Sequence, residues 1–458
     1  MKVIVCGAGQ VGASIAQQLA SEHNDVTVID RSAETIHRIN ETMDVQALQG
    51  HAAFPDVLER AGIAGADMII AVTQNDEVNM IACQVAHSLF GVPVKVARVR
   101  SQNYLDPAWG NLFSRDHLPI DLIISPEMEV ARAVVRRLHV PGASDMISFV
   151  DDRVRVVAVA LGEECPLVDT PLRQLTALFP DLHIRIMAIM RGEALMVPTP
   201  DDQMLIGDEV YFAVDTQHLV RSMDAFGHNE NESRRVVIIG GGNIGLFIAR
   251  LMQAEFSNLN LKIIERSKER AEYIADQLTG VDILHGDSLN SEILAEANVQ
   301  TAEAVLSVTN DDQVNVLSAL LAKRKGAKHA MPLINNAGYG PLMRSLGIDA
   351  VINPRSITVS RILQQVRKGR IRGVHSLRDG AAEIVEAEAL ETSPLVGVPL
   401  RDVDLPDGIV LGAIARKHQI IIPRGDTVIE AGDRIVAITR RETIKKMEKL
   451  FSVRIGFF

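Results

Sequence analysis

The sequence predicts an α/β protein with two tandem doubly wound parallel-sheet domains, each followed by a small α+β domain. Short runs of apolar and β-branched residues alternate with helical stretches, which is typical of parallel sheets. The first run enters a glycine-rich turn in VIVCGAGQVG at 3–12. VVIIGGGNIG at 236–245 repeats this pattern, and the similarity continues in the same order along both halves. The chain is therefore interpreted as a duplication in which each copy has two parts.

The elements of the first half follow from the alternation of apolar runs and amphipathic segments. Helices are expected at 10–21 and 76–89. The strands of the first sheet are expected at about 3–7, 26–29, 45–48, 68–72, 94–99 and 121–124. The small domain is predicted as a compact β-α-β-β unit, from RVRVVAVAL, a helical stretch near 171–178, HIRIMAIM and EVYFAV.

Matching segments extend the repeat into the small domains. CPLVDTPLRQL at 165–175 resembles SPLVGVPLRDV at 393–403, and the polar stretch GHNENESRR at 227–235 separates the halves. Because that stretch has no helical or strand period, it is interpreted as a linker. The helices near 126–139 and 354–366 are candidate crossovers between neighbouring units, although packing within their own domains fits them equally well. The predicted division is 1–139, 140–227, a linker at 228–234, 235–369 and 370–458.

The glycine turns predict two nucleotide sites of the Rossmann-like type. Each turn follows a strand, opens a helix and precedes an acidic residue at the end of the next strand, which is more specific than a lone GxGxxG. Gly7 permits the tight turn, Gly9 lets a phosphate approach bare backbone, and Gly12 lets the helix pack on the strand. Amides at the helix N-terminus then face the pyrophosphate. The turn residues are Gly7, Ala8, Gly9, Gln10, Val11 and Gly12, and Gly240, Gly241, Gly242, Asn243, Ile244 and Gly245.

An acidic residue ends the second strand of each half. Asp30 and Glu265 are placed to accept hydrogen bonds from ribose hydroxyls, and a carboxylate there repels a 2′-phosphate, so NAD is favoured over NADP. Arg31 and Arg266 follow directly and leave three roles open: pairing with such a phosphate, stacking on adenine, or lying in solvent.

Further candidates lie where strands three and four end. His51 and its counterpart Asp287 follow the third strand and are assigned a turn or ribose contact. The fourth strand delivers polar residues to the carboxyl edge of the sheet, where ligands of open α/β sheets bind. Helix capping and ligand contact are equally good roles for Asn75 and Asp76, whereas Thr73 is assigned to the ligand. The edge candidates are Thr73, Asn75, Asp76, Thr309 and Asp311.

The two halves differ in charge after the fifth strand. VARVRS places Arg98 and Arg100 on one face, whereas the matching MPLINN is uncharged. Two arginines near a phosphate site can neutralise an additional phosphate group. The first site is therefore predicted to accept ATP or ADP as well as a dinucleotide, and the second to suit NAD(H).

Composition limits the classes of partner and chemistry. The formal net charge of −11 gives no basic surplus for a nucleic-acid backbone. The sequence has no apolar run of about 18 residues and no signal-peptide pattern, so a cytosolic protein without membrane insertion is expected. The cysteines lack metal or disulfide spacing, so no metal site is expected. No catalytic constellation accompanies the turns, and a non-enzyme is predicted; the alternative is a soluble NAD-dependent dehydrogenase with duplicated cofactor domains.

The motifs GAGQVG, VID, QGH, AVTQNDEVNMIACQVA, ARVRS, ISPE, GGGNIG and VTNDDQVN resemble the NAD-binding regulatory components of bacterial Trk potassium-uptake systems. The resemblance covers essentially the whole chain, and single-copy relatives are the RCK or KTN regulators of Ktr transporters and potassium channels. It implies a peripheral, cytoplasmic, homotetrameric ring at the inner face of the plasma membrane, bound to a TrkH-like potassium translocator. NAD(H), ATP and ADP are the implied ligands, and their exchange is implied to change the ring and gate transport. The second half departs from the pattern where GHAA becomes GDSL and both arginines are lost.

Overall fold

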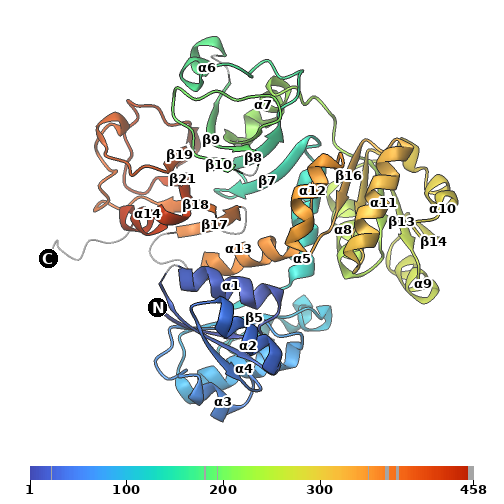
Figure 1. The fold of residues 1–458 in the computed structure, drawn as a ribbon, viewed down its shortest axis with the longest axis vertical. Helices are drawn as coiled ribbons and strands as arrows, with labels where there is room; N and C mark the ends of the chain where they lie inside the picture. Colours follow the sequence, from blue (N-terminus) through green and yellow to red (C-terminus); the bar gives the residue numbers. More distant parts are fainter. Residues whose placement is uncertain are drawn as a thin grey trace. The chain divides into compact units, whose positions relative to one another are not determined.

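The computed structural model describes residues 1–451 apart from 22, 180–181, 193, 349, 367–370 and 378–380. Two parallel sheets alternate along the chain with two antiparallel sheets, which confirms the predicted fold class (Figure 1). The chain divides into two compact units. One unit comprises Met1–Glu129 with Arg355–Arg367, and the other comprises Val130–Pro354 with Lys368–Phe458.

The first parallel sheet has the strand order β3-β2-β1-β4-β5-β6. Its strands are β1 (Lys2–Cys6), β2 (Asp25–Asp30), β3 (Gln46–Gln49), β4 (Met68–Ala71), β5 (Val94–Arg98) and β6 (Leu122–Ile124). Its helices are α1 (Gln10–Ser21), α2 (Ala33–Thr42), α3 (Pro55–Arg60) and α4 (Asp76–Phe90), with short 3-10 turns at Gln102–Tyr104 and Pro107–Phe113. The strand order reverses at β1, between β2 and β4. Such a switch point is where open α/β sheets bind ligands.

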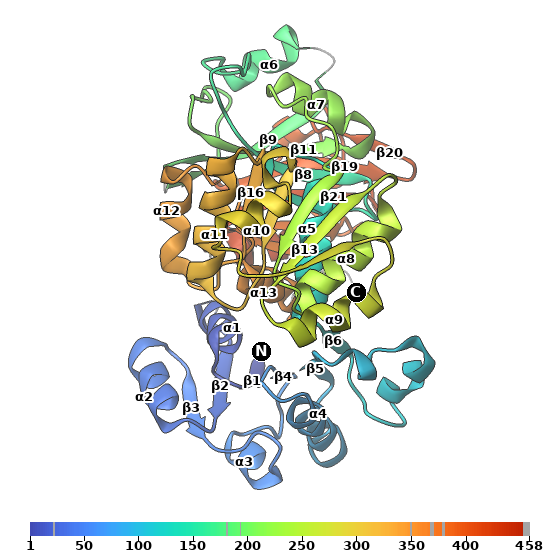
Figure 2. The ribbon, with the colours of Figure 1, turned by 90° about the vertical axis from the view of Figure 1, so that its right-hand side faces the viewer.

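The second parallel sheet repeats this order as β14-β13-β12-β15-β16. A parallel bridge from Leu333 to Ile352 extends it beyond β16. The strands are β12 (Arg235–Ile239), β13 (Asn260–Glu265), β14 (Asp282–His285), β15 (Ala304–Ser307) and β16 (His329–Pro332). The helices are α8 (Asn243–Glu255), α9 (Lys268–Gln277), α10 (Ser291–Glu296), α11 (Asp312–Lys325) and α12 (Gly340–Ser345). Helices α8 and α9 lie on one side of this sheet and α10 and α11 on the other (Figure 2).

Each small domain is a five-stranded antiparallel sheet, with the orders β10-β9-β11-β8-β7 and β17-β18-β21-β19-β20. The first contains β7 (Ala143–Phe149), β8 (Val154–Ala160), α6 (Leu172–Leu178), β9 (Ile184–Arg191), β10 (Ala194–Met196), β11 (Glu209–Asp215) and α7 (Leu219–Ala225). The second contains β17 (Ile371–Leu377), β18 (Ala382–Glu388), β19 (Ile409–Arg416), β20 (Gln419–Ile421), β21 (Arg434–Arg440) and α14 (Ile444–Leu450). The expected β-α-β-β unit corresponds to β8, α6, β9 and β11, and the edge strands β7 and β10 were not anticipated.

The two linking helices are exchanged between the compact units. Helix α13 (Pro354–Val366) ends the second parallel domain in sequence, yet Arg355–Arg367 group with Met1–Glu129. Helix α5 (Pro126–Leu138) begins in that unit, and its residues from Val130 onward belong to the other. This grouping favours the crossover interpretation of α13 over packing within its own domain.

The two antiparallel sheets share one hydrophobic core within the second unit. The cluster combines Phe149 and Val156 of the first sheet with Ile384 and Val436 of the second, all of which are buried. Neither sheet can bury this apolar face alone, so pairing removes it from water for both.

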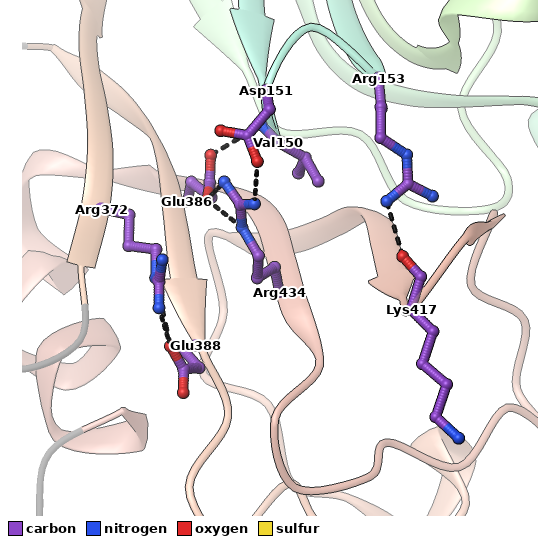
Figure 3. A network of polar contacts seen from close by, with 8 residues as sticks. All are labelled: Val150, Asp151, Arg153, Arg372, Glu386, Glu388, Lys417 and Arg434. Carbon is purple, nitrogen blue, oxygen red and sulfur yellow. Dashed lines mark hydrogen bonds and ion pairs between the residues drawn. The ribbon is translucent and has the colours of Figure 1, made fainter.

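The buried carboxylate of Glu386 links the two small domains (Figure 3). Glu386 Oε2 accepts a hydrogen bond from the Val150 amide at 2.8 Å, and Oε1 accepts one from Arg434 Nε at 2.7 Å. Val150 and Asp151 have φ angles of 54° and 53°, which β-branched Val150 rarely adopts. Arg434 also donates to Asp151, and this hydrogen bond and the charge lower the pKa of Asp151. Glu386 therefore holds a strained turn of the other domain.

A second polar cluster joins four segments of this unit. Asp145 on β7 accepts a hydrogen bond from Arg137 Nη2 of α5 at 2.7 Å, and its Oδ2 lies 3.5 Å from His375 Nε2 on β17. Arg137 also donates to the Val351 carbonyl at 3.0 Å. Burial alone would raise the pKa of Asp145, but Arg137 and His375 outweigh it and hold that pKa well below the usual range.

Replacing Glu386 by alanine is expected to destabilise the paired antiparallel domains by about 2–3 kcal/mol, because the Val150 amide and Arg434 lose a buried acceptor. Glu388→Ala is the matched control: Glu388 pairs with Arg372 and is less buried than Glu386 (Figure 3). This variant is expected to cost about 1 kcal/mol or less. Urea unfolding followed by circular dichroism measures both variants. Equal shifts of the two unfolding midpoints would contradict this assignment.

Asp145 is expected to make stability depend on pH in acid. Its folded-state pKa is depressed, so its stabilising contribution is present above the unfolded pKa and is lost as the pH falls below about 4. The Asp145→Asn variant is therefore expected to be less stable than the parent at pH 7 and to approach it as the pH is lowered. Thermal unfolding between pH 7 and pH 3 measures this, and a constant difference would refute it.

Candidate nucleotide sites

Each glycine turn begins with a residue in the left-handed region. Gly7 and Gly240 have φ angles of +100° and +103°, a backbone conformation that residues other than glycine rarely adopt. Their amides donate to the carbonyls of Ile29 and Ile264 at 2.8 and 2.9 Å, so the turns leave the sheet in the same way. The predicted tight turn is present in both halves.

The later glycines of each turn have different surroundings. A Cβ at Gly12 would lie 1.9 Å from the Gly7 carbonyl oxygen, and one at Gly245 would lie 2.1 Å from the Gly240 carbonyl oxygen. By contrast, a Cβ at Gly9 or Gly242 would meet no atom within 4 Å. Packing therefore requires glycine at the third position, whereas the middle position is open where a phosphate is predicted to approach.

The acidic residue at the end of the second strand binds its own glycine turn. Asp30 Oδ2 accepts from the Ala8 amide at 2.7 Å, and Glu265 Oε2 accepts from the Gly241 amide at the same distance. Their other oxygens accept from the amides of Ser32 and Ser267. Carboxylate oxygens have further lone pairs, so these contacts fix the acids in place without using all their acceptor capacity.

The half-buried threonine after the fourth strand is clamped by the buried Asn79. The amide and hydroxyl of Thr73 both donate to Asn79 Oδ1, at 2.8 and 2.7 Å. Asn79 Nδ2 donates to the carbonyls of Thr73 and Arg98, which ties the ends of β4 and β5 together. Thr309 and Asn315 repeat the arrangement, with Leu333 in the place of Arg98. The polar groups of Thr73 thus already have partners inside the fold.

The other polar residues at this edge also support the local fold. Asn75 is the N-cap of α4 and accepts from the Val78 amide, and Asp311 caps α11. Asp76 Oδ2 accepts from the Arg100 amide at 2.9 Å and also from the Ser101 amide. Capping is therefore the observed role of Asn75, while Asp76 orders the loop after β5.

Arg98 and Arg100 have different environments. Arg100 Nε donates to Glu127 at 2.8 Å, so this charge is paired. Within the described residues, Arg98 Nε is buried and has no hydrogen-bond partner. Burial and the nearby Arg100 charge lower the pKa of Arg98. Arg98 is consequently the better placed of the two to bind an additional anion.

The remaining candidates lie in local contacts or in solvent. His51 stacks on Phe54 with ring centroids 4.5 Å apart, and its Nδ1 accepts from the Ala53 amide. Asp287 Oδ1 accepts from the Leu289 amide at 2.9 Å. The side chains of Arg31 and Arg266 are exposed. Sequence reasoning missed Arg270, which hydrogen-bonds to the second turn.

Other classes of site are not apparent in the described part of the chain. No helix there combines the length and apolar character needed to span a bilayer. No three metal-ligating side chains gather there as a metal site. Burial raises the pKa of Cys6 to about 12, which keeps this thiol protonated.

Comparison with known proteins identifies the family. The family model for the TrkA-N domain matches residues 3–126 and 236–354, and that for the TrkA-C domain matches 156–226 and 384–452. The chain belongs to the TrkA family. It is 53% identical over 458 residues to the Trk system potassium uptake protein TrkA of Azorhizobium caulinodans, with 100% of both chains covered. The TrkA-family assignment agrees with the tandem α/β and antiparallel architecture.

Two solved structures share the fold at low sequence identity. The crystal structure of the GsuK RCK domain superposes with a TM-score of 0.61 at 15% identity and covers 99% of this chain and 95% of that one. The GsuK channel bound to NAD gives the same TM-score and identity and covers 99% and 79%. The TrkA-family chain therefore has the fold of RCK domains.

The glycines of the second turn are expected to differ in their effect on stability. Gly245→Ser forces a side chain into the Gly240 carbonyl and is expected to cost about 3 kcal/mol. Gly242→Ser adds the same side chain at an open N-cap position and is expected to be neutral or slightly stabilising. Thermal unfolding without nucleotide compares the two variants. A larger loss at Gly242 than at Gly245 would show that the turn is packed differently.

Proposed function

We propose that this chain is the nucleotide-sensing regulatory subunit of a potassium-uptake system. The observation that carries the proposal is the pair of glycine turns whose middle residues, Gly9 and Gly242, are open beside a helix N-terminus. Helix N-termini with bare backbone favour phosphate groups. Membership of the TrkA family connects these two sites with potassium uptake, because its curated relatives are named as Trk system potassium uptake proteins.

NAD(H) is the proposed ligand of both turns. The residues fit a dinucleotide, because each turn offers an open phosphate approach and an acid held at the end of the second strand. Asp30 and Glu265 are proposed to accept from ribose hydroxyls with their remaining lone pairs. A solved channel with the same fold is described as bound to NAD, which supports the choice.

ATP and ADP are proposed as additional ligands of the first site. The Nε of the half-buried Arg98 supports this preference, because a buried guanidinium nitrogen without a hydrogen-bond acceptor favours an anion beside it. The second half has Leu333 at the corresponding contact of the clamp and therefore lacks this cation. The two sites are thus proposed to report different nucleotides.

Occupancy rather than turnover is the proposed output. The edge residues Thr73, Asn75 and Asp76 make hydrogen bonds within the fold, and His51 stacks on Phe54 and accepts from the Ala53 amide, so each of them has a structural role. A ligand shifts a conformational equilibrium only by its difference in affinity for the two states, and a near-complete shift requires about 5.5 kcal/mol. With two sites in each chain of an oligomer, every bound nucleotide needs to supply only a fraction of this difference in binding free energy.

The family resemblance also supports a proposal for the assembly and its location. We propose a homotetrameric ring at the cytoplasmic face of the plasma membrane, bound to a TrkH-like potassium translocator and changing shape when nucleotides exchange. Its building blocks are proposed as 1–139 and 140–227, then 235–369 and 370–458, joined by 228–234. Size-exclusion chromatography with light scattering on the full chain tests the tetramer.

Blocking either turn should remove one nucleotide from each chain. Gly9→Asp and Gly242→Asp place a carboxylate where phosphate is proposed to bind, at positions where an added Cβ meets no atom within 4 Å. Calorimetry with NADH is expected to give two sites per parent chain, one in each variant and none in the double variant. Unchanged stoichiometry in both single variants would refute the site assignment.

The same variants separate the ligands and the output. ATP binding is expected to disappear in Gly9→Asp and to persist in Gly242→Asp. Potassium flux through the reconstituted translocator is expected to lose its ATP response in the first variant only. Oxidation of NADH by candidate substrates, followed by ultraviolet absorbance, would instead support the dehydrogenase alternative.

A further inference from the structure

We propose that Arg270 on α9 is the phosphate-binding cation of the second glycine turn and that it gives this site its affinity for the diphosphate of an adenine dinucleotide. The inference rests on the proposed function and goes beyond it, because the second site draws its positive charge from a different element than the first. In the first half the candidate cation is Arg98, at the end of β5.

The guanidinium of Arg270 spans the middle of the turn. Its Nε donates to the Gly241 carbonyl at 2.7 Å, and its Nη2 donates to Asn243 Oδ1 at 3.3 Å. These two residues flank Gly242, where an added Cβ would meet no atom within 4 Å. The charged group is therefore adjacent to the position that is open to a phosphate.

The electrostatics of this arrangement favour an anion. Asn243 begins α8, so Arg270 is near the positive end of a helix dipole. Its acceptors are a neutral carbonyl and a neutral amide oxygen, and the described residues give it no carboxylate partner. A cation is repelled by the positive end of a helix dipole. A phosphate bound between Arg270 and the N-terminus of α8 would be attracted to both.

Neighbouring residues hold Arg270 in this position. Its guanidinium carbon lies 4.8 Å from the centroid of the Tyr273 ring, in a cation–π contact. Ile274 lies one turn of α9 after Arg270 and packs against the glycine-rich turn, since its Cδ1 would lie 2.1 Å from a Cβ added at Gly241. The side chain is thus preorganised, which reduces the entropy lost when it binds phosphate.

The first half has no such cation at the equivalent position. Ser32 caps α2 by accepting from the Thr35 amide, as Ser267 caps α9 by accepting from the Arg270 amide. Thr35 therefore occupies the place of Arg270. The two sites bring a guanidinium to the nucleotide from different sides, Arg98 from the sheet edge and Arg270 from the helix after the second strand.

The test uses the full-length chain carrying Gly9→Asp, so that only the second site binds. In this background Arg270→Gln is expected to weaken NAD+ binding about 10- to 100-fold, and Arg270→Lys about 3- to 10-fold, because lysine keeps the charge but loses the fork. Lys268→Gln removes a charge from the same helix, where Lys268 is exposed beside Glu272. This control is expected to change affinity less than about twofold.

Salt dependence and a gain of function separate phosphate binding from a structural role. The affinity of the parent for NAD+ should fall as salt rises from about 50 to about 300 mM, and Arg270→Gln should weaken this dependence. Thr35→Arg in a chain carrying Gly242→Asp is expected to strengthen NAD+ binding at the first site. Unchanged affinity and salt dependence in Arg270→Gln, with unchanged thermal unfolding, would overturn the proposal. Absence of NAD+ binding by the Gly9→Asp parent would instead overturn the proposed second site itself.

Discussion

The tight contact between a glycine and a carbonyl within each turn fixes the path of the chain from strand to helix. Gly12 and Gly245 lie so close to the carbonyls of Gly7 and Gly240 that the helix must begin directly over the strand end. The acid of the next strand also hydrogen-bonds to the turn, through the Ala8 or Gly241 amide. With the turn fixed by these two contacts, the middle glycine is left open beside the first amides of the helix. The site is a consequence of packing rather than an addition to it.

Duplication preserved this backbone arrangement and allowed the charged side chains to diverge. The Thr-Asn clamp is the same in both halves, with Asn79 and Asn315 joining two strand ends. The candidate cations are not: Arg98 follows the sheet edge, and Arg270 extends from a helix. A backbone amide recognises any phosphate, whereas a guanidinium recognises one in a particular place. Divergence of the cations is therefore the simplest physical route from one site to two with different preferences.

Apolar periodicity predicted the elements that have apolar cores. The strands expected at 3–7 and 94–99 are Lys2–Cys6 and Val94–Arg98, because continuous β-branched runs are typical of buried parallel strands. Strand β7 was missed since ASDMISF contains Asp145, whose burial is possible only with partners distant in sequence. Arg270 was missed for a related reason: on a helix, a solvated arginine and one bound to a neighbouring turn have the same local pattern.

The asymmetry of the two small domains argues that they are adapted to pair with each other within one chain. Their cores merge, yet Glu386 on β18 occupies the position that Ala158 holds on β8. Glu386 finds the Val150 amide of the first domain and Arg434 of its own, so its burial is compensated in this pairing. Pairing of two first domains would lack the carboxylate that holds the strained Val150 turn, because Ala158 stands in its place. Unequal partners thus favour the internal pair over pairs of identical domains.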